Sequence, residues 1–163
     1  MREVVTFNLN GNEVQALVEP QATLLETLRD TIGLTSPKCG CNRGDCGTCT
    51  VKLDGKAVKS CMVAAATIEG RSVITVDGIY DGENLHPVQK AFHEYGAPQC
   101  GYCSPGMVMA TVAYLEENPN PSEEEMKEAL SGNLCRCGAY NKYLAGAMAA
   151  AKGEFGPIPK GGK

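Results

Sequence analysis

Hydrophobic and polar residues alternate in two short runs near the start of the chain, residues 5–9 and 14–18. A period of two is typical of strands that bury one face. The Asn10-Gly11 pair between the runs favours the left-handed backbone of a two-residue turn. The pattern therefore predicts an N-terminal β-hairpin.

A short helix is predicted next. Thr23 and Glu26 have the spacing of a capping box, in which each side chain binds the other residue's backbone N–H. Apolar residues then extend the helix toward Ile32, and Gly33 is a typical residue for its end.

A second hairpin follows a cysteine-rich loop. Residues 51–53 and 57–58 flank Asp54-Gly55, another favourable turn pair, and a last strand is expected over residues 72–76. Two hairpins, one helix packed across them and a final strand fit a small β-grasp domain.

The second half of the chain has the three- and four-residue apolar spacing of helices. Helix starts are marked by Ser104-Pro105, interpreted as an N-cap and a first-turn proline, and by a capping box at Ser122 and Glu125. The predicted helices cover residues 86–95, 107–117, 122–130 and 139–152.

The expected fold class is α+β, with two domains. We expect a β-grasp domain over residues 1–78 and a four-helix domain over residues 79–153. The polar stretch 77–84 is the expected linker, and residues 154–163 are expected to form a flexible tail. With 43% hydrophobic residues but only three Phe and no Trp, two such small domains would benefit from metal cross-links.

Charge and hydropathy exclude several classes of function. A net charge of −4 argues against a nucleic-acid partner, which requires a basic face. No apolar run reaches 18 residues, so no membrane span is expected. Residues 1–7 carry charge where a signal peptide has an apolar core, which predicts a cytoplasmic protein. In that reducing compartment, nine cysteines indicate metal binding or redox chemistry rather than disulfides.

The first cysteine group is Cys41, Cys46 and Cys49 in one loop, with Cys61 twelve positions later. This C-x4-C-x2-C…C spacing is that of plant-type [2Fe–2S] ferredoxins. A structural zinc site is the alternative, but zinc prefers paired cysteine knuckles, whereas three cysteines here share one glycine-rich loop. The loop glycines, which let the backbone wrap closely around a cluster, are Gly40, Gly44 and Gly47.

The second group consists of Cys100 and Cys103, and of Cys135 and Cys137. Cys103 stands just before a predicted helix, where the helix dipole favours thiolate. All four cysteines can therefore meet at one end of a helical bundle. A second [2Fe–2S] cluster is favoured, and the spacing alone leaves zinc open as the alternative.

The remaining candidate ligands are interpreted as bystanders. His86 and His93 lie outside both groups, which excludes a Rieske cluster because that type requires two histidine ligands. Cys39 would change the loop spacing to six intervening residues, and we interpret it as a non-ligand neighbour of Cys41.

Three motifs, in order, resemble the small iron–sulfur subunits of the molybdenum hydroxylases, the xanthine oxidase family. They are residues 38–51 (KCGCNRGDCGTCTV), 99–107 (QCGYCSPGM) and 132–137 (GNLCRC). The likeness covers nearly the whole chain. It departs from the family at Cys39, where an acidic residue or glutamine is usual, and at Gly138-Ala139, where Thr-Gly is usual.

The resemblance implies partners and cofactors that lie on other chains. It implies a large molybdopterin-binding subunit, a medium subunit that binds FAD, and a dimer of heterotrimers. By similarity, the cluster of Cys100, Cys103, Cys135 and Cys137 lies nearest the molybdenum cofactor, and the first cluster lies toward the flavin. Gln99 and Cys137 match positions that contact the pterin.

The predicted function is electron relay through two [2Fe–2S] clusters, between the molybdopterin site and a flavin or another acceptor. Substrate chemistry takes place elsewhere, because the sequence offers no nucleophile–base pair. Two alternatives stay open at this point: a free-standing two-cluster ferredoxin and a zinc-stabilised interaction module.

Overall fold

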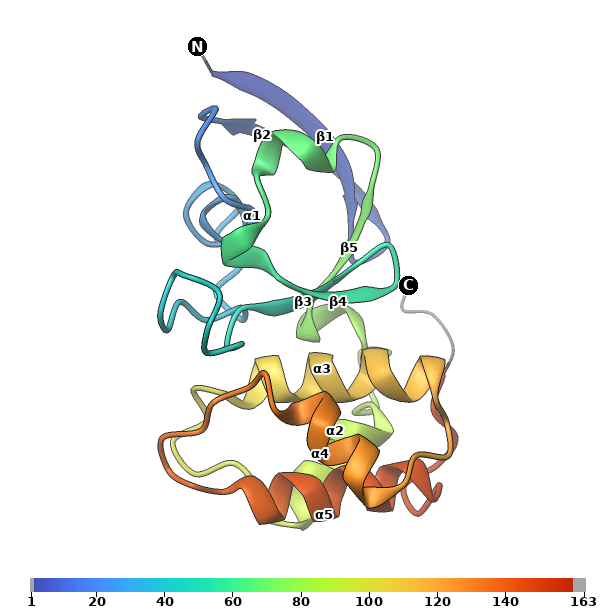
Figure 1. The fold of residues 1–163 in the computed structure, drawn as a ribbon. Coiled ribbons are helices and arrows are strands. Elements are labelled where there is room, and N and C mark those ends of the chain that lie inside the picture. The colour runs from blue at the N-terminus through green and yellow to red at the C-terminus, as the bar shows by residue number, and fades with distance from the viewer. Residues whose placement is uncertain (1, 160–163) are drawn as a thin grey trace.

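A computed structural model describes residues 2–159. A five-stranded mixed sheet forms one half of the molecule and a group of helices forms the other half, the upper and lower parts of Figure 1. The strand order is β2-β1-β5-β3-β4, with β1 and β5 parallel and the other neighbours antiparallel. The strands are β1 (Glu3–Leu9), β2 (Asn12–Val18), β3 (Thr50–Leu53), β4 (Lys56–Lys59) and β5 (Ser72–Ile74).

Both predicted hairpin turns are confirmed. Asn10 and Gly11 have φ values of 52° and 84°, and Asp54 and Gly55 have φ values of 49° and 85°. Two successive residues with positive φ form the turn whose twist matches the flanking strands. The last strand is shorter than expected and ends at Ile74.

The predicted first helix is present but changes its hydrogen bonding after one turn. The capping box of Thr23 and Glu26 opens α1 (Leu24–Glu26), which continues as a π-helical turn over Thr27–Thr31. The N–H of Ile32 donates to the carbonyl of Thr27 at 3.0 Å. This short element covers the sheet, and its Leu24 and Leu28 are completely buried in a core shared with β1, β3 and β5.

The second half contains four helices, α2 (Pro87–Glu94), α3 (Ser104–Glu117), α4 (Glu123–Leu130) and α5 (Tyr140–Ala151). Their buried side chains form a second core, separate from that of the sheet. The expectation that Ser104 is an N-cap is wrong, because Cys103 holds that position and α3 already includes Ser104. The α+β class is confirmed.

The end of the described chain returns to the helical core. Phe155 and Ile158 are half-buried against it, and Phe155 stands edge-on to Tyr95 with ring centroids 6.4 Å apart. Residues 160–163, part of the expected flexible tail, lie outside the described residues. Within residues 2–159 no helix is both long and apolar enough to cross a bilayer.

The two halves meet where α3 lies along β3 and β4 (Figure 1). Lys52 of β3 is buried there, and its ammonium donates to a carboxylate oxygen of Glu116 on α3 at 2.7 Å. Their side chains are 2% and 14% exposed. This poorly exposed ion pair orients the sheet relative to the helix. Separating the two side chains would leave a buried charge without its partner, which is energetically costly.

His86 makes the stability of this interface pH-dependent. It is buried at the start of α2, where Nδ1 accepts the N–H of Val88 at 3.2 Å. Burial, and then the charge of Lys52, lower the pKa of His86 to about 4. Histidine in the unfolded chain titrates near about 6.5. The stability that neutral His86 contributes is therefore fully present above pH ~6.5. This contribution is lost as the pH falls toward about 4, because the unfolded chain binds the proton first.

We expect the wild type to lose about 2 kcal/mol of stability through His86 between pH 7 and pH 5. His86→Asn keeps a helix-capping side chain but cannot titrate, so its thermal midpoint should fall less over this interval. Circular-dichroism melts of both proteins at equal cluster loading measure the difference. If the thermal midpoints of the two proteins fall equally between pH 7 and pH 5, His86 does not titrate in this way.

Candidate metal centres

The first cysteine loop is shaped to stabilise thiolate. The sulfur of Cys41 accepts the N–H of Cys46 at 3.4 Å, and hydrogen bonds from the backbone of Cys46 and then Arg43 lower the pKa of Cys41 to about 6. The sulfur of Cys46 lies 3.3 Å from the hydroxyl of Thr48. Backbone donors aimed at a sulfur are the arrangement that an anionic iron–sulfur cluster requires.

The other two cysteines of the first set are buried on the inner side of the loop. Cys49 and Cys61 pack together with Leu25 of α1. Cys61 lies on a 3-10 turn, Ser60–Met62, where the Ser60 hydroxyl donates to the Cys49 carbonyl at 2.7 Å. Burial, and then the neighbouring Cys49, raise the pKa of Cys61 to about 11. The Cys61 thiol therefore ionises readily only beside a positive charge, such as that of a metal ion.

Two loop glycines are required by close contacts. A Cβ on Gly40 would lie 2.7 Å from the Cys46 sulfur, and one on Gly47 would lie 2.5 Å from the carbonyl oxygen of Gly132. The backbone of Gly47 also has φ +69°, which disfavours other residues. Glycine at these positions lets the loop fold tightly around its sulfurs and against the second half of the chain.

The second set of four cysteines comes together from two loops. Burial raises the pKa of Cys103 to about 11. The N–H of Tyr102 and then the side chain of Cys137 lower the pKa of Cys100. Burial opposes ionisation of Cys135, but hydrogen bonds led by the N–H of Ala139 and by Cys103 lower its pKa overall. Each of these thiols thus interacts with at least one other member of the set.

The two cysteine sets lie against one another. The N–H of Leu134 donates to the carbonyl of Cys46 at 2.9 Å, and the Asn133 amide donates to the carbonyl of Gly47 at 2.9 Å. A single hydrogen bond therefore links the backbone of a first-set cysteine to the residue before Cys135. A hollow of about 420 Å³ separates the sets, and five of its lining residues are Cys41, Cys46, Cys100, Cys103 and Cys135.

The chemistry of the ligand sets fits two-iron clusters. Each set offers four cysteine thiols, and in a [2Fe–2S] cluster two thiolates bind each of two irons. The first set also has the C-x4-C-x2-C…C spacing of plant-type ferredoxins, whereas structural zinc prefers paired cysteine knuckles. The eight cysteines remain the predicted ligands.

The other predicted site residues lie at the surface. Cys39, Gln99 and Cys137 are all exposed. Cys39 contributes no sulfur contact to the first set, although its carbonyl accepts the hydroxyl of Tyr102 at 2.7 Å. The exposed positions of Gln99 and Cys137 leave them accessible to a partner chain, and their contact with a pterin stays a prediction.

Three polar contacts to the cysteine loops are not predicted by the sequence patterns. They come from the Asn133 amide, from the hydroxyl of Tyr140, which accepts the N–H of Cys135 at 2.9 Å, and from Tyr143. The hydroxyl of Tyr143 lies 3.7 Å from the Cys103 sulfur. The GNLCRC motif is a signal for Asn133, but no local pattern identifies the two tyrosines.

Comparison with known proteins agrees with this geometry. Residues 7–74 match the family model of the 2Fe-2S iron-sulfur cluster binding domain, and residues 75–148 match that of the [2Fe-2S] binding domain. The small FeS subunit of nicotinate dehydrogenase from Eubacterium barkeri is 43% identical over 86% of this chain and 90% of that protein. The small subunit of nicotine 6-hydroxylase from Paenarthrobacter nicotinovorans is 43% identical over 95% and 93%.

The chain belongs to the small iron–sulfur subunits of the xanthine oxidase family. Solved structures agree with this assignment. Quinoline 2-oxidoreductase from Pseudomonas putida 86 superposes with a TM-score of 0.86 at 40% identity, covering 94% of this chain and 98% of that chain. Aldehyde oxidoreductase from Desulfovibrio desulfuricans gives 0.87 at 41% identity, over 91% of this chain and 17% of that chain.

Family membership defines the role of the small subunit. It is the electron-transfer component of a molybdenum oxidoreductase, has two [2Fe–2S] domains, and works with a large subunit that contains molybdopterin. The [2Fe–2S] clusters supply one-electron redox chemistry. The protein contributes the spacing, burial and hydrogen bonds that set how readily each cluster takes up an electron.

Proposed function

We propose that the small subunit relays electrons between a molybdopterin site and a flavin, with the ligands divided by sequence half. Cys41, Cys46, Cys49 and Cys61 would hold the first [2Fe–2S] cluster in a β-grasp domain, residues 1–78. Cys100, Cys103, Cys135 and Cys137 would hold the second in a four-helix domain, residues 79–153. The two separate apolar cores support this division.

One observation carries the proposal: cysteines from both sets line a single hollow, and the two cysteine loops are joined by the Leu134–Cys46 hydrogen bond. Electron transfer between two one-electron centres requires a short and fixed separation. Here the separation is fixed by direct backbone contact, rather than by the linker. The buried Lys52–Glu116 pair secures the same interface on the sheet side.

The exposed side of the second cysteine set supports a proposal for where the partner subunit binds. Cys100, Cys137 and Gln99 are exposed there, together with the large apolar side chains of Tyr102 and Leu134. We propose that this side faces the molybdopterin subunit and that Gln99 and Cys137 contact the pterin. A medium subunit that binds FAD would receive electrons from the first cluster, in a dimer of heterotrimers in the cytoplasm.

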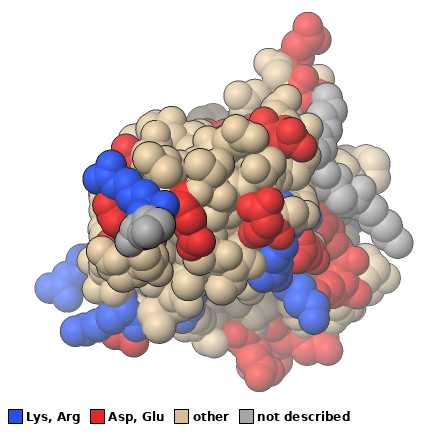
Figure 2. Space-filling model, turned by 90° about the horizontal axis from the view of Figure 1, so that it is seen from above, with Lys and Arg blue, Asp and Glu red and all other residues tan. Residues whose placement is uncertain are grey.

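The surface charge supports a protein partner rather than nucleic acid. On the face shown in Figure 2, acidic and basic side chains are interspersed among neutral residues, without a continuous basic area. The net charge of the whole chain is −4. Nucleic acids, which are rich in phosphate, bind to protein surfaces on which positive charge is concentrated.

Anaerobic purification of the tagged chain from its native host tests the proposal. We expect about four irons per chain, EPR signals from two distinct reduced centres, and molybdenum and flavin subunits in the same complex. Two clusters without partner subunits would support a free-standing ferredoxin instead. A colourless protein with zinc and about one iron or less would contradict the cluster assignment.

A further inference from the structure

A tyrosine of α5 reaches the second cysteine set from the interior of the helical half. The hydroxyl of Tyr143 lies 2.7 Å from the hydroxyl of Ser104 and 3.7 Å from the sulfur of Cys103. Tyr143 is 1% exposed and Cys103 is 7% exposed. The three groups form a chain that begins at half-buried Ser104, passes through buried Tyr143 and ends at a predicted iron ligand, Cys103.

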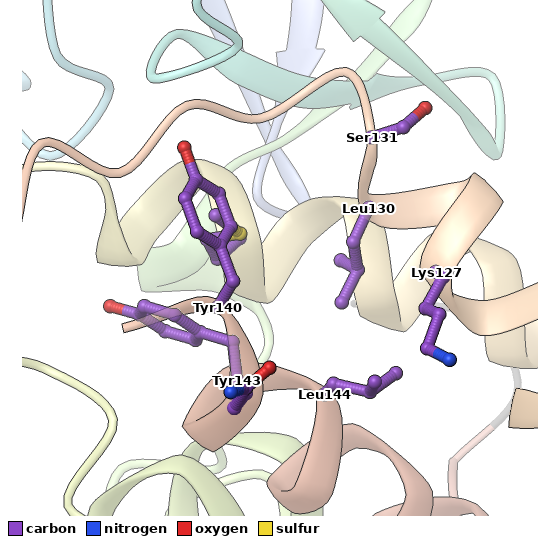
Figure 3. A pocket seen from close by; sticks show the side chains of 8 residues that line it. Lys127, Leu130, Ser131, Tyr140, Tyr143 and Leu144 are labelled. Atoms are coloured by element: carbon purple, nitrogen blue, oxygen red, sulfur yellow. The ribbon is translucent and has the colours of Figure 1, made fainter. Parts of the chain in front are cut away.

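The ring of Tyr143 is held in this position by packing. It stands edge-on to Phe92 of α2, with ring centroids 4.9 Å apart. On its other side it lines an apolar hollow of about 280 Å³, where Figure 3 shows it beside Tyr140 and across from Leu130 and Lys127. Because the ring is buried and packs edge-on against Phe92, its hydroxyl has little freedom to move.

Loss of the Cys103 proton fixes the direction of the hydrogen bonds. A free thiol can donate to the tyrosine oxygen, but a metal-bound cysteine is a thiolate and has no proton to donate. Burial raises the pKa of Tyr143 above the usual value for tyrosine, so its hydroxyl keeps its proton at neutral pH. Between these two atoms, only Tyr143 can then be the donor. Ser104 completes the chain by donating to the oxygen of Tyr143.

We infer that the Tyr143 hydroxyl donates a hydrogen bond to the Cys103 sulfur and raises the reduction potential of the second cluster. The inference rests on the proposed ligation of iron by Cys103. Reduction adds negative charge to the cluster and its sulfurs, so a donor at the sulfur stabilises the reduced state more than the oxidised state. Burial strengthens the effect because little water screens the charge.

Tyr143→Phe removes only the hydroxyl and keeps the ring that packs on Phe92. We expect the equilibrium constant for one-electron reduction of the second cluster to fall about tenfold, which is about 59 mV. The first cluster should keep its potential. An EPR-monitored redox titration of the complete complex reads both centres separately. Exchangeable-proton ENDOR in H2O and D2O should show one strongly coupled proton fewer at the second cluster.

Tyr114→Phe is the matched control. Tyr114 lies on α3, and its hydroxyl accepts the amide of Asn118 at 3.2 Å rather than contacting sulfur, so neither potential should change. If Tyr143→Phe does not assemble, Ser104→Ala with Tyr143→Phe removes both hydroxyls and leaves no unpaired partner. An unchanged second potential, with full iron content and both EPR signals, would overturn the inference. If iron stays bound when Cys103 is replaced by alanine, the ligand assignment itself is wrong.

Discussion

Cys49→Ala is expected to halve the iron content of the small subunit, from about four irons per chain to about two. Cys49 is 2% exposed and lies beside Cys61, so no water or neighbouring side chain can readily take its place at the metal. Reduction of the flavin by substrate should fall by more than the about 10–100-fold typical of residues that only support a ligand. Iron analysis, EPR and stopped-flow flavin reduction measure these losses.

Cys39→Ala is the matched control for this experiment. Cys39 is exposed, precedes Cys41 by two positions, and contributes a backbone carbonyl rather than a sulfur to the contacts described above. The variant should retain both clusters, both EPR signals and the wild-type rate. Loss of the first cluster in Cys39→Ala, with retention in Cys49→Ala, would reverse the assignment of ligand and neighbour.

The second large effect is expected at the ion pair between the halves. Glu116→Gln leaves the ammonium of Lys52 buried without its counter-charge, which costs about 3 kcal/mol. For a chain of this size, that corresponds to a decrease of about 6–12 °C in the thermal midpoint. Melts of the cluster-loaded chain measure the shift. The double variant Lys52→Met with Glu116→Leu should recover most of it, because apolar side chains then fill the same space.

Lys127→Gln provides the comparison for an exposed lysine. Lys127 pairs with Glu123 and Glu124 on the surface of α4, and its side chain is 45% exposed. Exposed pairs contribute less than about 1 kcal/mol. If Lys127→Gln shifts the midpoint as much as Glu116→Gln does, the buried pair is not what secures the interface.

The features that the sequence predicts well are those set by neighbouring residues. Asn10-Gly11 and Asp54-Gly55 form their turns because two residues determine the backbone of such a turn. The capping boxes beginning at Thr23 and Ser122 are equally local, since each closes within four residues. The spacing of the cysteines likewise reflects the geometry of one loop around a cluster.

The features that could not be predicted depend on contacts between distant segments. Lys52 alternates with apolar residues as if it faced solvent, yet α3 covers that face of the sheet. The cap at Cys103 instead of Ser104 has a similar cause, because Ser104 pairs with Tyr143, 39 residues later. The sequence patterns therefore indicate the candidate metal ligands, which stay a prediction, but they do not indicate the polar groups that surround them.

The segment that connects the two halves is held in place differently from the loop at residues 131–138. Residues 80–85 are exposed and form a turn with its own internal hydrogen bonds, such as that from the N–H of Asn84 to Asp81. The relative placement of the two cysteine loops depends instead on Asn133 and Leu134, which bind the opposite loop directly. A longer or shorter connection is therefore expected to leave the contact between the two cysteine loops intact, whereas an insertion beside Leu134 is expected to break it.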